Sequence, residues 1–109
     1  MKGGWVYMMA DRYRGAIYIG VTAYIEARAF QHATQVGSDF CRRYGITKLV
    51  WAEYAERIDD AIVREKQMKK WRRAWKIELI ETVNPDWLDL FETMNGGTEE
   101  GAVFPKELR

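Results

Sequence analysis

The sequence predicts an α/β fold of the α+β kind, in which a three-stranded antiparallel sheet is flanked by helices. Three short apolar segments are rich in β-branched and aromatic residues, and a short polar break separates the first two. Later segments place apolar residues at helical spacing. The expected order is strand, strand, helix, strand, helix, helix (β-β-α-β-α-α). A chain of 109 residues is long enough for one modest core.

The three strands are expected over residues 5–10, 16–21 and 49–54. Residues 11–14, with Gly15 after them, form a polar break of hairpin length between the first two strands. The first two strands should therefore form a β-hairpin.

The length of the hairpin loop sets which residues face each other. A four-residue loop would pair Ala10 with Gly15, and Tyr7 would then face Tyr18. Because directly opposed residues point to one side of a sheet, both phenols would emerge together.

The first helix is expected over about residues 24–34, with Thr22 as its N-cap. Arg28 and His32 are four residues apart, so they share one face of this helix. The following segment, 35–47, is expected to be a loop with one helical turn in it. Taken alone, Arg28 and His32 are equally compatible with a solvated surface pair.

The second helix is expected to start at Asp59 or Asp60 and to run to about Trp71. Glu65 lies among the apolar positions of this helix, and a carboxylate there is costly unless it is paired or bound to a metal. A salt bridge to Lys69, four residues later, is the simpler alternative. The expected apolar stripe consists of Ile58, Ala61, Ile62 and Met68.

Shorter elements are expected toward the C-terminal end of the sequence. Residues 77–82 are predicted to form a further short helix, and residues 85–88 to begin a last one. Residues 1–92 are predicted to form one domain and residues 93–109 a flexible tail, because that segment combines glycines, acidic residues and an isolated proline.

The net charge of +1 hides an asymmetry along the chain. Residues 1–76 have a formal charge of +7, and residues 77–109 have one of −6. Phosphate contacts come from basic side chains, so a nucleic-acid-binding surface is predicted at Arg64, Lys66, Lys69, Lys70, Arg72 and Arg73. Trp71 and Trp75 are interleaved with these cations, and we expect both tryptophans to fill the core.

Two classes of protein do not fit the sequence. No run of about 18 apolar residues and no signal-peptide pattern is present, which predicts a soluble, cytoplasmic protein without membrane contact. Cys41 is the only cysteine, so neither an intramolecular disulfide nor a cysteine-based zinc site is possible. We expect Cys41 to be a packed side chain.

The order of these elements resembles the GIY-YIG endonuclease superfamily, over roughly residues 4–90. The resemblance is to its small stand-alone bacterial branch, and to the nuclease domain of the excision-repair incision subunit. Four motifs occur in order: Trp5-Val6-Tyr7, Tyr18-Ile19-Gly20, the pattern from Ile25 through Arg28 to His32, and the helix Ala61 to Trp71 around Glu65. Trp5 replaces the glycine of the first motif, and Ala27 stands where this branch often has a second arginine.

The resemblance implies a GIY-YIG nuclease fold and a metal-dependent endonuclease that acts on nucleic acid; DNA is the expected substrate, in repair or DNA processing, and RNA stays open. It implies that Tyr7 assists deprotonation of water, that Arg28 neutralises the phosphate, and that Tyr18 and His32 support proton transfer and orientation. Glu65 would bind one divalent ion, Mg²⁺ or Mn²⁺. The alternative is a nucleic-acid-binding module with the same fold and little or no activity.

Overall fold

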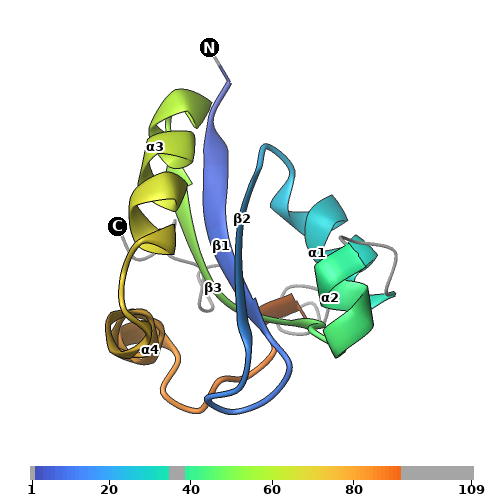
Figure 1. The fold of residues 1–109 in the computed structure, drawn as a ribbon. Helices are drawn as coiled ribbons and strands as arrows, with labels where there is room; N and C mark the ends of the chain where they lie inside the picture. Colours follow the sequence, from blue (N-terminus) through green and yellow to red (C-terminus); the bar gives the residue numbers. More distant parts are fainter. Residues whose placement is uncertain (1, 35–38, 92–109) are drawn as a thin grey trace.

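The computed structural model describes residues 2–34 and 39–91. Its centre is a three-stranded antiparallel sheet with the strand order β2-β1-β3 (Figure 1). The strands are β1 (Gly4–Ala10), β2 (Ile17–Thr22) and β3 (Lys48–Ala55). The central position of β1 suits its sequence, because almost every residue in it is apolar and buried. The predicted sheet and its hairpin are confirmed.

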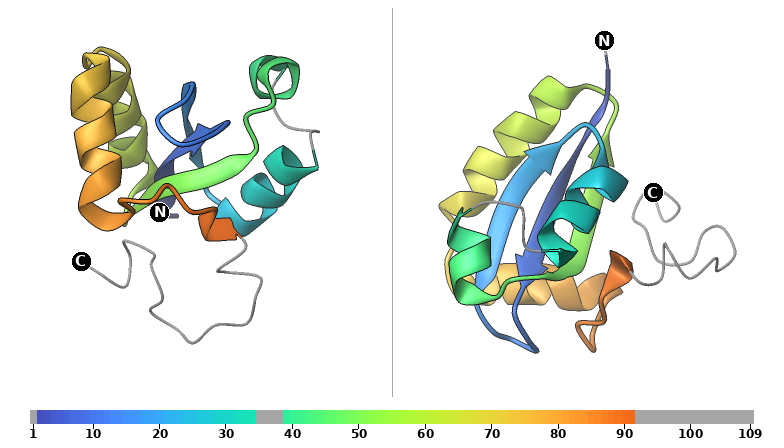
Figure 2. Two further views of the ribbon diagram at one scale, coloured as in Figure 1. Left: turned by 90° about the horizontal axis from the view of Figure 1, so that it is seen from below. Right: turned by 90° about the vertical axis from the view of Figure 1, so that its right-hand side faces the viewer.

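Helices cover both faces of the sheet (Figures 1 and 2). One face carries α1 (Ile25–Ala33) and α2 (Asp39–Tyr44), and the other carries α3 (Ile58–Lys69) and α4 (Arg73–Val83). The predicted class, an antiparallel sheet flanked by helices, is therefore correct. The predicted order lacked α2, because its six residues follow a glycine- and serine-containing segment without helical periodicity.

Strand alternation divides the apolar residues of β1 between two cores. Val6 and Met8 pack toward α3 and α4, whereas Tyr7 and Met9 pack toward α1 and α2. Cys41 is buried in this second core, as expected for a packed side chain.

The pairing of β1 with β3 contains one irregularity. Met8 pairs with Trp51 and Met9 pairs with Leu49, which leaves Val50 as an extra residue in β3. Val50 and Trp51 consequently contribute to the same core, on the α3 and α4 side. The bulge thus supplies two consecutive side chains to one face of the sheet.

The register of the hairpin differs from the predicted one by two residues. Tyr7 pairs with Gly20, and Met9 pairs with Tyr18, so the loop has six residues instead of four. The loop is longer because the side chain of Asp11 accepts a hydrogen bond of 2.7 Å from the backbone N–H of Ala16 and holds it outside the ladder. A shift of two residues preserves the face, so Tyr7 and Tyr18 still lie on one side of the sheet.

The boundary between the last two helices also differs from the prediction. The helix around Glu65 begins at Ile58 and ends at Lys69, and α4 begins at Arg73, four residues earlier than expected. An extended backbone at Arg72 separates the two helices. Ile62, which was placed on the apolar stripe, is 37% exposed, while Ala61 and Met68 are buried as predicted.

The last predicted helix does not begin within residues 85–88, which follow Asn84 as a turn; the chain becomes helical at Leu90 and Phe91, the last described residues. The Asn84 amide donates hydrogen bonds to the carbonyls of Val50 and Leu88, and its oxygen accepts one from the Leu88 N–H. Asn84 therefore has a structural role. The predicted tail, residues 93–109, lies outside the described residues.

Candidate active site

Three aromatic side chains from three elements meet on the α1 side of the sheet. The ring centroids of Tyr7 and Tyr18 are 6.3 Å apart, and His32 lies 5.8 Å from Tyr7 and 5.6 Å from Tyr18. The tyrosines come from adjacent strands, and the histidine comes from the last turn of α1. The structure therefore brings together three of the predicted site residues.

A hydrogen bond joins two members of this cluster. The Tyr7 hydroxyl lies 3.3 Å from Nε2 of His32, and both side chains are almost fully buried. Among the described residues, Nδ1 of His32 has no hydrogen-bond partner. An unpaired polar nitrogen in a buried position is uncommon, and such groups occur at sites that bind or react.

The surroundings favour the neutral forms of Tyr7 and His32. Burial, reinforced by the neighbouring Tyr18, raises the pKa of Tyr7 above its usual value, and the charge of Arg28 opposes this change. Burial, followed by the charge of Arg28, lowers the pKa of His32. At neutral pH the pair thus consists of a phenol and a neutral imidazole, which is able to accept a proton.

Arg28 is a cation whose charge changes the pKa values of both members of this pair. It lies half-buried on α1, one turn before His32. Its charge acts on both Tyr7 and His32, and His32, on the same helical face, contacts the rings of both tyrosines.

Gly20 provides the space for the Tyr7 side chain. A Cβ atom built on Gly20 would lie 2.5 Å from the Tyr7 hydroxyl oxygen and 2.6 Å from Cζ. A side chain cannot occupy that position unless the phenol moves. The glycine of Tyr18-Ile19-Gly20 therefore allows the phenol of the opposite strand to cross the backbone of β2.

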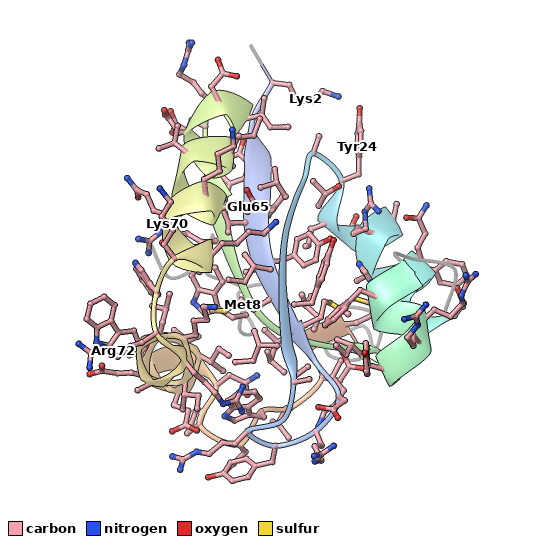
Figure 3. The ribbon with its side chains drawn as sticks, in the orientation of Figure 1. Lys2, Met8, Tyr24, Glu65, Lys70 and Arg72 are labelled. Atoms are coloured by element: carbon pink, nitrogen blue, oxygen red, sulfur yellow. The ribbon has the colours of Figure 1, made fainter. Side chains whose placement is uncertain are left out.

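Glu65 is placed differently from the other four residues. It lies on α3, which packs on β1 and β2 from the opposite face of the sheet (Figure 3). Its side chain is only 14% exposed and forms a salt bridge of 2.6 Å with Lys69. The salt bridge left open as the simpler alternative is thus present. Because β2 is an edge strand, the two faces meet along its free edge.

A comparison with models of protein families shows which family this chain belongs to. The model of the GIY-YIG catalytic domain matches residues 3–78, well over half of the chain. The chain belongs to the GIY-YIG family. No curated protein and no solved structure matched it. The function is therefore of the nuclease type, and a nucleic acid is the class of substrate that this membership implies.

GIY-YIG nuclease chemistry raises the question of a divalent ion. The described parts of the chain contain no group of three or more histidine, cysteine, aspartate or glutamate side chains placed to hold a metal. Glu65, as a single partly buried carboxylate, fits Mg²⁺, which keeps several waters and completes its shell with phosphate oxygens. The same carboxylate would have to exchange Lys69 for the ion.

Two aromatic residues beside the cluster were missed in the sequence. Phe40 on α2 stacks against Tyr18 with centroids 6.2 Å apart and an interplanar angle of 28°, and Tyr44 lies 4.9 Å from Phe40. Both are about half exposed. Their four-residue spacing was the available signal, but the segment was expected to be mainly loop.

The predicted basic surface divides into two groups. Arg64 forms a salt bridge of 3.0 Å with Glu53, and Arg73 donates hydrogen bonds to the backbone carbonyls of Arg14 and Gly15 in the hairpin loop. The remaining cations are exposed at the end of α3 and between α3 and α4: Lys66, Lys69, Lys70 and Arg72. Figure 3 labels Lys70 and Arg72.

Within the described residues, no helix has the length and apolar character needed to span a membrane.

Proposed function

We propose that this GIY-YIG domain is a divalent-metal-dependent endonuclease that hydrolyses phosphodiester bonds in DNA. Its active site would consist of Tyr7, Tyr18, Arg28, His32 and Glu65. The observation that carries the proposal is the buried cluster of Tyr7, Tyr18 and His32 under the charge of Arg28. A role in DNA repair remains a prediction from the resemblance, and a cytoplasmic location remains a prediction from the sequence composition.

The hydrogen bond between Tyr7 and His32 supports a concerted transfer of two protons. As the attacking water gives a proton to the Tyr7 oxygen, the phenol gives its own proton to Nε2 of His32. This arrangement suits the raised pKa of Tyr7, because a free phenolate never has to accumulate. His32, being neutral, is in the form that accepts the proton.

Arg28 would neutralise the phosphate while the charge on its oxygens increases during attack. The same contact would help His32, because a bound phosphate offsets the positive charge that lowers the pKa of that histidine. Arg28 would thus favour proton uptake by His32 only when substrate is bound.

Glu65 would hold the metal ion, which supplies Lewis-acid stabilisation of phosphate oxygens when it is bound. The free edge of β2 supports this assignment, since a phosphate lying along that edge is accessible from both faces of the sheet. Lys69, the present partner of Glu65, would then be available for a neighbouring phosphate.

One substrate panel tests the proposal. Supercoiled plasmid, linear duplex, single-stranded DNA, branched DNA and RNA are each incubated with the protein in Mg²⁺ or in chelator. We expect cleavage of at least one DNA substrate in Mg²⁺ and none in chelator. Cleavage that is equal in chelator, or confined to RNA, would contradict the proposal.

A non-catalytic nucleic-acid-binding module is the second candidate. The pairing of Glu65 with Lys69 favours it, because this carboxylate already has a cationic partner. Binding across the same panel without any Mg²⁺-stimulated cleavage would favour this module over the enzyme.

A further inference from the structure

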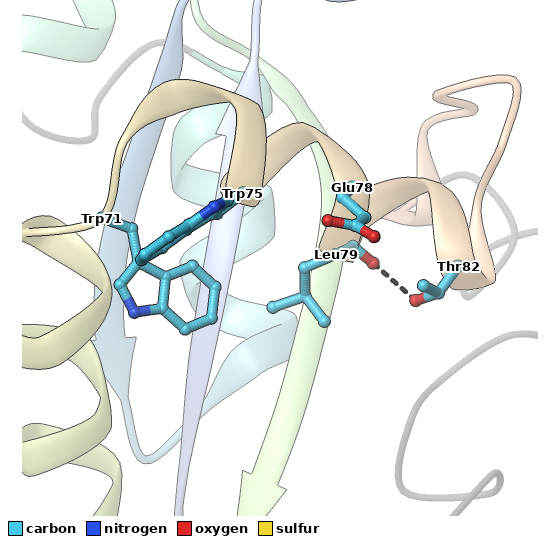
Figure 4. A pocket seen from close by; sticks show the side chains of 5 residues that line it. All are labelled: Trp71, Trp75, Glu78, Leu79 and Thr82. Atoms are coloured by element: carbon cyan, nitrogen blue, oxygen red, sulfur yellow. Dashed lines mark hydrogen bonds between the residues drawn. The ribbon is translucent and has the colours of Figure 1, made fainter.

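The tryptophans at the corner between α3 and α4 line a pocket on the surface. Its volume is about 450 Å³, within the range of ligand sites, and its walls are Trp71, Trp75, Glu78, Leu79 and Thr82 (Figure 4). Trp75 is 47% exposed, which contradicts the expectation that it fills the core. Trp71 is half-buried and packs against the core, in partial agreement with that expectation.

The two indole rings form an open aromatic corner. Their centroids are 6.1 Å apart, and the planes meet at 79°. The two rings therefore meet edge to face and are not stacked on each other, and Trp75 is about half exposed. The exposed one, Trp75, is suited to stack on a planar ring from outside the protein.

Guanidinium groups accompany both rings. Arg64 lies 5.4 Å from the centroid of Trp71, and Arg72 lies 4.8 Å from that of Trp75. Lys66 and Lys70 are exposed on the same helical run. The surroundings of the pocket therefore favour a ligand that combines planar rings with negative charge.

Glu78 gives the pocket a wall with a different character. Its carboxylate repels a phosphate, so the anionic part of a ligand is directed toward Arg64 and Arg72. An amino group on a planar ring could instead donate a hydrogen bond to Glu78. The hydroxyl of Thr82 already donates to the Leu79 carbonyl at 2.6 Å.

We propose that this pocket binds an unpaired base of a nucleic acid strand, stacked on Trp75, while Arg72, and Arg64 in exchange for its salt bridge with Glu53, contact the adjoining phosphates. Successive nucleotides alternate a planar base with an anionic phosphate, which matches this arrangement of rings and cations. The inference rests on the proposed function, which supplies the nucleic acid, and it narrows the substrate to one with an unpaired segment.

The location links the pocket to the candidate metal ligand. Trp71 follows Lys69 by two residues, and Lys69 pairs with Glu65 one helical turn before it. One turn of helix spans about 5.4 Å. An unpaired base in the pocket would thus lie near the end of α3 that carries Glu65.

Binding in chelator tests the pocket apart from cleavage. Fluorescein-labelled DNA of about 16 nucleotides is titrated by anisotropy, as a single strand and as a blunt duplex. The proteins are the wild type, Trp75→Ala, Trp75→Phe and Phe30→Ala. Phe30 is a matched control, because it is an exposed aromatic residue on α1, across the sheet.

We expect Trp75→Ala to weaken single-strand binding by about 5- to 150-fold, the usual effect of losing one stacked base. Trp75→Phe should restore most of the affinity, and Phe30→Ala should bind like the wild type. Unchanged single-strand affinity in Trp75→Ala would overturn the proposal. An equal loss for strand and duplex would also overturn it, since it would indicate backbone contacts alone.

Other occupants give distinguishable results. If the wild type is a dimer that Trp75→Ala converts to a monomer in sedimentation, the pocket is a self-association surface and the proposal fails. Circular dichroism of each variant confirms that the fold is kept.

Failure of the proposed function has a separate signature. If the protein cleaves no substrate in Mg²⁺ but Trp75→Ala weakens single-strand binding, the proposed activity fails and the base-binding pocket is supported. A protein that cleaves DNA while Trp75→Ala binds normally has the activity and lacks the base pocket.

Discussion

The hydroxyl of Tyr7 lies 3.3 Å from Nε2 of His32, inside the protein and within the electrostatic reach of Arg28. This contact joins the central strand of the sheet to the last turn of α1. It makes the two residues a proton-sharing pair instead of two independent groups. The pair has consequences for both stability and catalysis.

His32 should make the protein less stable in mild acid. It is the only histidine, and its pKa is lower in the folded protein than in the unfolded chain, where it is about 6.5. The unfolded state therefore binds more protons as the pH falls below about 6.5, and the free energy of unfolding decreases by at most about 1.4 kcal/mol per pH unit. The stabilisation is complete above that pH.

Urea unfolding at several pH values measures this effect. In the control variant His32→Gln, the free energy of unfolding should no longer decrease with falling pH in this range. The imidazole resonance of the wild type should also titrate below about 6.5 by NMR. A folded-state midpoint at or above the unfolded value would contradict the account.

Gly20→Ala should abolish cleavage, because the added Cβ would collide with the Tyr7 phenol. Overpacking of this kind costs about 1 to 3 kcal/mol of stability. Gly45→Ala is the matched control: nothing lies within 4 Å of its Cβ position, and its φ of 67° imposes only the strain of a left-handed backbone.

Cleavage assays on both glycine variants, below their unfolding temperatures, separate the two effects. We expect Gly45→Ala to retain cleavage and Gly20→Ala to lose it. Equal activity in the two variants would show that Tyr7 does not need its present position.

Glu81 should hold the hairpin loop in its register. It accepts hydrogen bonds of 2.7 and 2.8 Å from Arg14, and one of 2.7 Å from Nε1 of the buried Trp87. The Arg14 contact first, and the Trp87 contact second, lower the pKa of Glu81 to about 2. Its stabilising effect is therefore present above pH 4.5 and lost as the pH falls toward about 2.

Amide hydrogen exchange tests this role. Glu81→Ala should accelerate exchange of the protected amides in residues 11–16, whereas Glu81→Gln, which keeps an acceptor for Trp87, should have a smaller effect. If exchange in the loop is unchanged in Glu81→Ala, other contacts fix the loop.

The local pattern of apolar residues was sufficient to predict the sheet, the hairpin and α1. The hairpin register was not predictable in this way, because Arg73, some 60 positions along the chain, binds the loop carbonyls of Arg14 and Gly15. Because Asp11 also holds Ala16 in the loop, the loop is longer than the polar break that the sequence shows. A local contact of Asp11 and distant contacts of Arg73 therefore act together on the loop that precedes β2.

The candidate site shows the same limit. Helical spacing predicted that Arg28 and His32 share a face, and the structure places His32 against the rings of both tyrosines. The exposure of Trp75 had no local signal, because an indole next to cations has the same sequence pattern whether it fills a core or lines a pocket. Glu65 was correctly expected to be partly buried, but both of its proposed partners, Lys69 and a metal ion, were compatible with the sequence.

Cleavage of supercoiled plasmid by Tyr7→Phe and Glu65→Ala tests the central claim most directly. Rates are measured in Mg²⁺ under single-turnover conditions, and circular dichroism verifies the fold. The account predicts that Tyr7→Phe loses at least about 100-fold in rate, the usual minimum for an acid–base group, and that Glu65→Ala, which lacks the proposed metal ligand, loses the Mg²⁺-dependent cleavage. Undiminished cleavage by both variants would contradict it.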